Sequence, residues 1–196
     1  PFIGSINLGV LSVPATYLWI ICIMNFYNFV DGIDGLAAGV GVIGSLFLAF
    51  MARSSALPGL ALLYAILAGG GFGFLRYNFP PAKIFMGDTG STFLGFIFAA
   101  LAVISNGRGV PAFVTVLVFG SVFADALLTL SRRILNREKI LSPHRTHYYQ
   151  RLTSIGFSHK QVTLLEYIIT ASLGVSAFFF LTGDRIFITV FSVFWV

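Results

Sequence analysis

The feature that most constrains the fold of this chain is a series of long apolar runs separated by short polar segments. The runs cover about 8–24, 36–52, 60–75, 91–104, 110–130, 162–181 and 186–196. A helix needs roughly 20 apolar residues to cross a bilayer, so the last run is shorter than a full span. Composition agrees, with 57% hydrophobic and only 10% charged residues. We therefore predict an all-α, polytopic integral membrane bundle with about six to seven transmembrane helices and short loops.

The chain is predicted to form a single transmembrane domain over 1–196. It opens at Pro1, inside apolar sequence and without a methionine. We therefore expect it to be the C-terminal part of a longer protein, with N-terminal helices missing. Cys22 is the only cysteine and lies within an apolar run, so a disulfide framework is excluded and its expected role is packing.

The basic residues are distributed unevenly between the two sides that the runs define. When alternate sides are counted, nine fall on one side and many of these lie in a basic loop at about 132–160. By the positive-inside rule, that side is cytoplasmic. The net charge of +5 therefore reflects topology, and no nucleic-acid partner is expected. The nine are Arg76, Lys83, Arg132, Arg133, Arg137, Lys139, Arg145, Arg151 and Lys160, against Arg53, Arg108 and Arg185 on the other side.

The first polar stretch on the cytoplasmic side is 25–39, NFYNFVDGIDGLAAG. On a helical turn Asp31 and Asp34 are i,i+3 neighbours, as are Asn25 and Asn28, so each pair would face one site. Ionised carboxylates are costly in hydrocarbon, and two close ones would be relieved by a divalent cation or a cationic ligand. The glycines that follow the two acids would let backbone N–H groups approach a ligand. The alternative is a polar loop that only ends a transmembrane helix.

The second stretch is 86–91, MGDTGS, directly before an apolar run. Asp88 could cap the helix that begins here, because Asp, Thr and Ser all satisfy free N–H groups at a helix start. It could also bind magnesium, which selects carboxylate oxygen and keeps several waters. Capping explains neither the second glycine nor the shared side with Asp31 and Asp34, so we favour the metal role.

The third stretch is 142–151, SPHRTHYYQR. Its arginines offer a rigid fork of donors suited to phosphate oxygens, and its histidines can donate beside them. A structural zinc site is disfavoured because His144 and His147 lack cysteine partners. The alternative is a basic loop that anchors topology.

Two further polar residues have no assigned role in this interpretation. Asp125 lies inside an apolar run, where it would either pair with Arg132 or Arg133 or face the site. His159 is left unassigned, in a segment typical of a helix start.

Taken in order, NFYNFVDGIDGLAAG, FMGDTGSTFLGF and PHRTHYYQRL resemble the polyprenyl-phosphate N-acetylhexosamine-1-phosphate transferase family, over Asn25 to about Leu152. The segments HRTHYYQRL and FADALLTLSRR are more similar to the bacterial glycan-initiating branch than to the peptidoglycan translocase. The resemblance implies transfer of a sugar-1-phosphate from a UDP-N-acetylhexosamine to undecaprenyl phosphate, with release of UMP. It also implies a multi-pass protein of the bacterial inner membrane, with the active site on the cytoplasmic face and membrane lipid around it. The oligomeric state is left open, a homodimer included.

The resemblance also implies residue roles and a magnesium cofactor, with manganese as the alternative ion. Magnesium bridging the diphosphate would offset charge during attack by the lipid phosphate. The predicted catalytic residues are Asp31, Asp34 and Asp88; the predicted substrate-binding residues are Asn25, Asn28, His144, Arg145 and His147; and the predicted metal ligands are Asp88 and Asn28.

One family feature is missing from the chain, an adjacent Asp-Asp pair that belongs upstream of Asn25. We expect the missing N-terminal part to carry it and the chain alone to be inactive. The alternative function is a non-catalytic transporter or scaffold fragment that binds ions or lipid phosphate. A transport path should place polar groups near the membrane midplane, whereas the runs are nearly free of ionisable residues.

Overall fold

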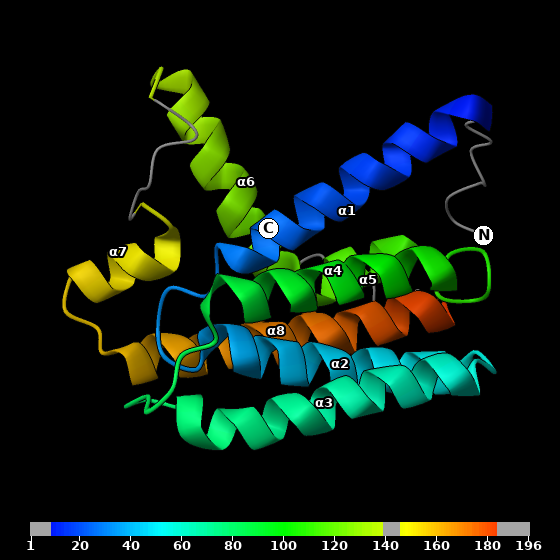
Figure 1. Cartoon of the computed structure of the whole chain (residues 1–196), viewed down its shortest axis with the longest axis horizontal. Coiled ribbons are helices and arrows are strands. Elements are labelled where there is room, and N and C mark those ends of the chain that lie inside the picture. Colours follow the sequence, from blue (N-terminus) through cyan, green and yellow to red (C-terminus); the bar gives the residue numbers. More distant parts are fainter. Residues whose placement is uncertain (1–8, 139–145, 184–196) are drawn as a thin grey trace.

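The computed structural model describes residues 9–138 and 146–183, and all regular elements in these residues are helical (Figure 1). The predicted all-α class is confirmed for this part of the chain, and the run at 186–196 lies outside it. The elements are the short 3-10 helix η1 (Gly9–Leu11) and the helices α1 (Ser12–Asn28), α2 (Leu36–Ser54), α3 (Pro58–Asn78), α4 (Gly87–Ser105), α5 (Ala112–Val118), α6 (Gly120–Leu135), α7 (Tyr148–Ser154) and α8 (His159–Thr182).

Five segments are long and apolar enough to cross a membrane: η1 with α1, then α2, α3, α4 and α8. The bent pair α5 and α6 makes a sixth if the two are counted as one span. The prediction of a polytopic helical membrane protein is therefore confirmed. Helix α2 lies at the centre and packs against α3 and α8, while α1 packs against α4 (Figure 1).

The run expected as one span at 110–130 is instead two helices that meet at 83°. The break falls at Phe119, between Val118 and Gly120. The Phe119 ring is fully buried, with its centroid 4.7 Å from that of Phe98 and 5.8 Å from that of Tyr27. A Cβ on Gly120 would lie 3.2 Å from Leu173 of α8. These contacts hold α5 in the bundle, while α6 leaves it at a steep angle (Figure 1).

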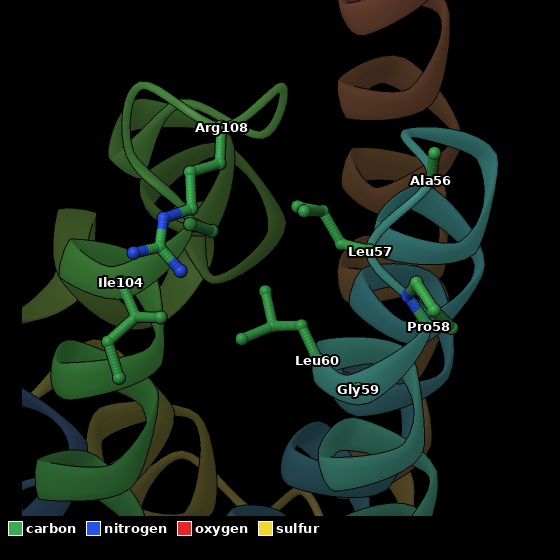
Figure 2. Close-up of a pocket in the computed structure, with 8 residues that line it drawn as sticks. Ala56, Leu57, Pro58, Gly59, Leu60, Ile104 and Arg108 are labelled. Atoms are coloured by element: carbon green, nitrogen blue, oxygen red, sulfur yellow. The ribbon is translucent and has the colours of Figure 1, made fainter.

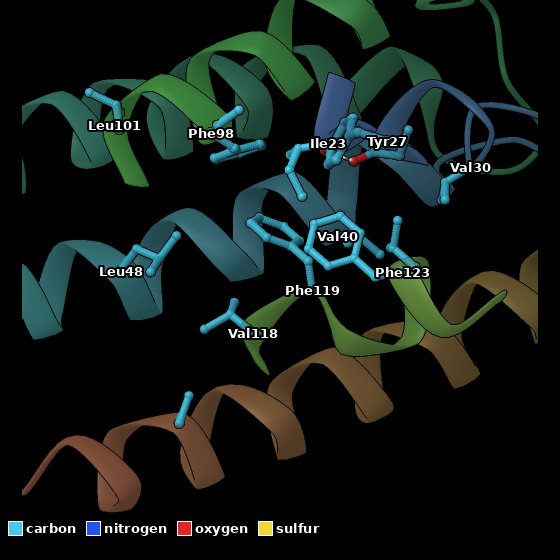
Figure 3. Packing of buried hydrophobic residues seen from close by; sticks show 14 of the residues in the cluster. Ile23, Tyr27, Val30, Val40, Leu48, Phe98, Leu101, Val118, Phe119 and Phe123 are labelled. Carbon is cyan, nitrogen blue, oxygen red and sulfur yellow. Dashed lines mark hydrogen bonds between the residues drawn. The ribbon is translucent and has the colours of Figure 1, made fainter. Parts of the chain in front are cut away.

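The core depends on glycines of α2 that admit aromatic rings from other helices. A Cβ on Gly41 would lie 2.4 Å from the Tyr27 hydroxyl, and one on Gly44 would lie 2.4 Å from the Phe119 ring. Small residues allow close helix approach in membranes. The aromatic cluster of Tyr27, Phe98 and Phe119 fills the space between α1, α2, α4 and α5 (Figure 3).

The helices bring all described polar stretches to one end of the bundle, on the left in Figure 1. The end of α1, the starts of α2, α4 and α8, and α7 all lie there. At the opposite end, the α2–α3 turn meets the α4–α5 connection, where the Ser55 hydroxyl donates to the Gly109 carbonyl at 3.4 Å. The cavity of about 320 Å³ in Figure 2 belongs to this opposite end. It is lined by Leu57, Leu60, Ile104 and Arg108, among others, and is remote from the predicted site.

Candidate active site

The turn between α1 and α2, residues 29–35, carries both acids of the first polar stretch. It is not helical, so the i,i+3 geometry expected for Asp31 and Asp34 does not apply, and the two carboxylates contact different elements. Gly35 is the N-cap residue before α2 and has φ +75°, a left-handed conformation that favours glycine. Its backbone N–H donates to Asn78 Oδ1 at 3.1 Å. Gly35 therefore serves the packing of the turn itself, through an α3 residue that the sequence did not single out.

Asp31 lies beside the start of α4, where the Gly87 backbone N–H donates to it. Burial raises the pKa of Asp31 to about 6, a hydrogen bond from the Gly87 backbone opposes the rise, and the negative charge of Asp88 adds to it. Nearby, the Ser91 hydroxyl donates to Asn28 Oδ1 at 2.5 Å. The structure thus brings together Asn28, Asp31 and Asp88, which were predicted from two separate motifs.

Asp34 points away from this pair and contacts three other groups. Its Oδ2 accepts from the Ala82 backbone N–H at 3.0 Å, and its Oδ1 lies 3.4 Å from His159 Nδ1. Its backbone carbonyl accepts from the Thr163 hydroxyl at 2.8 Å. Asp34 therefore joins the turn to the α3–α4 loop and to α8. Sequence reasoning missed His159 and Thr163; the only signal for His159 was its place on the cytoplasmic side.

Asn25 lies one turn before Asn28 on α1. Its side-chain amide donates to the Ile21 carbonyl of the same helix at 2.7 Å. Asn28 instead reaches Ser91 on α4. The role of Asn25 in substrate binding stays a prediction.

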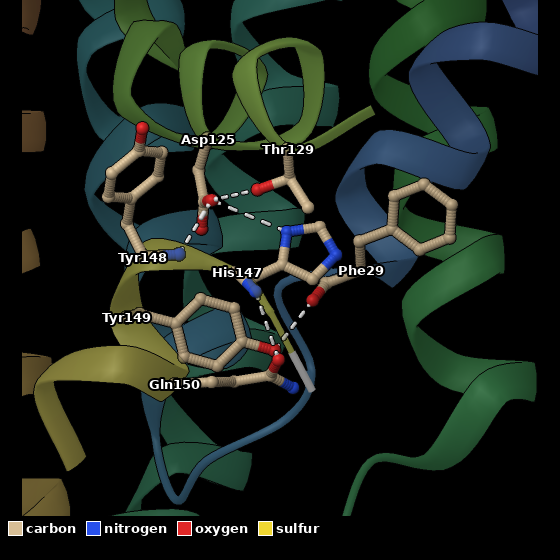
Figure 4. A network of polar contacts seen from close by, with 7 residues as sticks. All are labelled: Phe29, Asp125, Thr129, His147, Tyr148, Tyr149 and Gln150. Atoms are coloured by element: carbon tan, nitrogen blue, oxygen red, sulfur yellow. Dashed lines mark hydrogen bonds and ion pairs between the residues drawn. The ribbon is translucent and has the colours of Figure 1, made fainter. Parts of the chain in front are cut away.

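His147 is the described histidine of the third stretch, and it caps the start of α7 (Figure 4). Its side chain is 4% exposed, and Nδ1 lies 3.3 Å from Asp125 Oδ1 on α6. Its ring lies between the rings of Phe29 and Tyr149, with centroids 5.4 Å and 5.9 Å away. Of the two alternatives for Asp125, the structure therefore shows it facing the predicted site; Arg133 pairs with Glu138 at 3.2 Å.

Tyr149 connects this network to the acidic turn. Its hydroxyl donates to the Phe29 carbonyl at 2.7 Å, and burial raises the pKa of the phenol, which keeps it a neutral donor. A Cβ on Gly32 would lie 2.1 Å from that hydroxyl. Gly32 thus admits a tyrosine of the protein, where a ligand had been expected. The predicted substrate-binding residues His144 and Arg145 lie outside the described part of the chain.

The residues at the α1–α4 junction suit a magnesium ion better than a metal bound only by protein groups. Within 9–138 and 146–183, no three Asp, Glu, His or Cys side chains gather as a metal cluster. Magnesium, however, commonly binds through one or two carboxylates and keeps several waters. Asp31 and Asp88 supply two mutually repelling carboxylates, and the carbonyl oxygen of Asn28 can accept beyond its bond to Ser91.

The ionisable residues at one end of this bundle of candidate membrane spans mark a candidate functional site, because such residues are rare in membrane proteins and usually functional. Residues 1–106 match the sequence profile of glycosyl transferase family 4, which covers more than half of the chain, and the chain belongs to that family.

Curated relatives agree with this assignment. The chain is 38% identical to a probable undecaprenyl-phosphate N-acetylglucosaminyl 1-phosphate transferase of Bacillus subtilis, over 99% of the chain and 55% of that protein. It is 36% identical to a decaprenyl-phosphate N-acetylglucosaminephosphotransferase of Mycobacterium tuberculosis, over 88% and 49%. It is 35% identical to a phospho-N-acetylmuramoyl-pentapeptide-transferase of Clostridioides difficile, over 86% and 52%. The chain spans about half the length of these relatives.

Proposed function

We propose that this chain is part of a membrane enzyme that transfers N-acetylhexosamine-1-phosphate from a UDP-sugar to undecaprenyl phosphate, releasing UMP. The product would be the first lipid-linked sugar of a cell-surface glycan. The observation that carries the proposal is that the turn with Asp31, the start of α4 with Asp88 and the side chain of Asn28 lie together at one end of the bundle. The names of the relatives support the general reaction.

The charges in this region fit a reaction between two phosphate-bearing substrates. Asp31 and Asp88, with Asn28, would hold magnesium, which when bound offsets negative charge on the donor diphosphate. His147 lies on the far side of the acidic turn, where its ring is held against Phe29. From there it would orient a phosphate oxygen through a hydrogen bond. Asp34 would hold the turn against the α3–α4 loop through its hydrogen bond from the Ala82 backbone N–H.

A transporter or scaffold is the second candidate function. A transport path should carry polar or ionisable groups near the midplane of the spans. Among the five candidate spans, Glu166 of α8 is the only acidic residue beyond a first turn. This distribution favours an enzyme that works at the membrane surface.

The test uses the complete protein in detergent, with UDP-N-acetylglucosamine, undecaprenyl phosphate and magnesium, and follows UMP release. Wild type should release UMP only with lipid and metal, and EDTA should abolish release. Asp88→Asn should lower the rate roughly 100-fold or more, because the metal loses a charged ligand. Glu138→Gln, the same change outside the cluster, should stay within about twofold of wild type.

Two outcomes would contradict the proposal in different ways. Full activity of Asp88→Asn would leave the enzyme class but reduce Asp88 to a helix cap. No release from any UDP-N-acetylhexosamine would favour the binding or transport function.

A further inference from the structure

One carboxylate oxygen of Asp125 lies within hydrogen-bond distance of three groups, from Thr129, Tyr148 and His147 (Figure 4). Asp125 Oδ1 accepts from the Thr129 hydroxyl at 3.1 Å and from the Tyr148 backbone N–H at 2.9 Å, and His147 Nδ1 lies 3.3 Å away. The Asp125 side chain is 13% exposed. The sequence-based roles of the family motifs do not use this residue, yet it holds the only described histidine of the third motif.

We propose that Asp125 is a positioning residue for His147, which fixes the proton of the imidazole on Nδ1 and holds the ring against the acidic turn. The catalytic consequence rests on the proposed function. The placement of the proton does not, because it follows from contacts within this chain.

The chemistry of the contact decides where the proton lies. An ionised carboxylate can only accept hydrogen bonds, so the nitrogen that faces Asp125 must carry hydrogen. In the neutral ring, the lone pair then belongs to Nε2, on the ring edge away from Asp125. This arrangement prepares Nε2 to accept a proton or, once the ring is charged, to donate to a phosphate oxygen.

Packing around the ring prevents it from turning out of this arrangement. His147 is almost completely buried and lies between two aromatic rings, and the Tyr149 ring is nearly parallel to it, with an interplanar angle of 20°. Rotation of the ring by half a turn about χ2 would put a carbon atom where Nδ1 lies. The partly buried Asp125 carboxylate would then lose one hydrogen-bond donor.

The same contacts connect α6 to the acidic turn. Phe29, which packs against His147, directly follows Asn28, and its carbonyl accepts from Tyr149. The bend between α5 and α6 turns α6 away from the direction of α5 (Figure 1). Asp125 of α6 contacts His147 and Tyr148 at this end of the bundle. A movement of α6 would therefore be transmitted through His147 to the turn that carries Asp31.

The first test measures the proton directly. The complete protein is labelled with ¹⁵N-histidine in nanodiscs, and His147 is assigned by difference from His147→Gln. Wild type should show the proton of the neutral ring on Nδ1. Asp125→Leu, which removes the acceptor at similar size, should move the proton to Nε2. If Asp125→Leu fails to fold, the wild-type spectrum alone decides, and a proton on Nε2 in wild type overturns the proposal.

The second test separates positioning from a purely structural cap on α7. Asp125→Asn keeps an acceptor for the Tyr148 N–H but loses the charge beside the imidazole. We expect kcat to fall about 10–100-fold with KM within about threefold, as for a supporting residue that orients a histidine. Thr129→Val removes only one donor and should stay within about twofold.

The outcomes are distinguishable. An Asp125→Asn variant as active as wild type overturns the positioning role. If wild type shows the proton on Nδ1 but releases no UMP, the proposed function fails while the assignment of Asp125 is supported.

Discussion

Three aspartates near the site have different environments, although the sequence presents them alike. Asp31 accepts from the Gly87 backbone beside Asp88, Asp34 contacts the α3–α4 loop and α8, and Asp125 accepts from α6 and α7. Burial and the negative charge of Asp88 raise the pKa of Asp31 to about 6. The titration of Asp31 should therefore be visible in the stability of the protein.

Asp31 should make the metal-free protein less stable as pH rises from about 4 to 6. Its folded pKa of about 6 exceeds the ordinary value of 3.8, so over this range the folded state keeps a proton that the unfolded state has released. The contribution of Asp31 is therefore present at low pH and is lost as pH passes 6. Thermal unfolding in detergent with EDTA, measured from pH 4.5 to 7, checks this for wild type and Asp31→Asn.

Asp31→Asn should not show this loss of stability with rising pH, and it should unfold at a higher temperature than wild type at pH 7. Magnesium should stabilise wild type more at pH 7 than at pH 5, because the ion needs the ionised carboxylate. Parallel pH profiles for the two proteins would show that Asp31 is not perturbed as described.

The chemistry at residue scale was only partly readable from the sequence. The acids, amides and histidines could be selected because such groups are rare between apolar runs. Their partners could not, because the turn at 29–35 has no helical period that would fix which side chains meet. The contact of Asp34 with His159 joins residues 125 positions apart and depends on how α8 packs on α2.

Among the elements, hydropathy predicts α2, α3, α4 and α8 to within a few residues at most ends. It does not predict the bend at Phe119, because the run stays apolar across it and contains no proline at that point. The bend depends on tertiary packing of the Phe119 ring against Phe98 and Tyr27. Contacts between residues this far apart in the sequence leave no signal in the local hydropathy pattern.

The packing of α1 on α4 gives a test at the same scale. A Cβ on Gly95 of α4 would lie 2.8 Å from Met24 Cα and 2.9 Å from the Met24 carbonyl oxygen. Backbone cannot move aside as a flexible side chain can, so Gly95→Ala should destabilise the protein by about 1–3 kcal/mol. Thermal unfolding in detergent measures the change.

Gly70→Ala on α3 is the matched control for Gly95→Ala. No described atom lies within 4 Å of a Cβ at Gly70, so the same substitution should be neutral or slightly stabilising there. Equal unfolding temperatures for the two variants would contradict the close α1–α4 contact. Because α1 ends at Asn28 and α4 begins beside Asp88, loss of activity in Gly95→Ala should accompany the loss of stability.

At the scale of the whole molecule, the site is assembled from segments between residues 28 and 159 that meet at one end of the bundle. The sequence predicted this common side by counting alternate spans, and the described helices place the acidic turn, the α4 start and α7 together (Figure 1). Counting spans assigns each polar stretch to one side of the membrane, but it gives no distances between residues. It could not show that Asp31 lies at the start of α4 while Asp34 contacts the α3–α4 loop and α8.

The distribution of basic residues predicts which side of the membrane this end of the bundle faces. The basic residues gather at the site end, and Arg53 and Arg108 are the described exceptions at the other. The positive-inside rule therefore predicts that the site faces the cytoplasm, where a nucleotide-sugar donor would be available. Single cysteines can be placed at exposed positions in a background without native cysteines: Arg108→Cys at one end, and Lys83→Cys and Ile155→Cys at the other.

A membrane-impermeant maleimide should label Arg108→Cys in intact cells. It should reach Lys83→Cys and Ile155→Cys only after the membrane is opened, because charged reagents do not cross hydrocarbon. The two cysteines at the site end come from loops on either side of the α5–α6 bend, so they also test whether that pair crosses the membrane as one broken span. Labelling of Ile155→Cys but not Lys83→Cys in intact cells would mean that the pair returns to the side it entered from. That result would separate α7 and His147 from Asp31, and the site described here could not form.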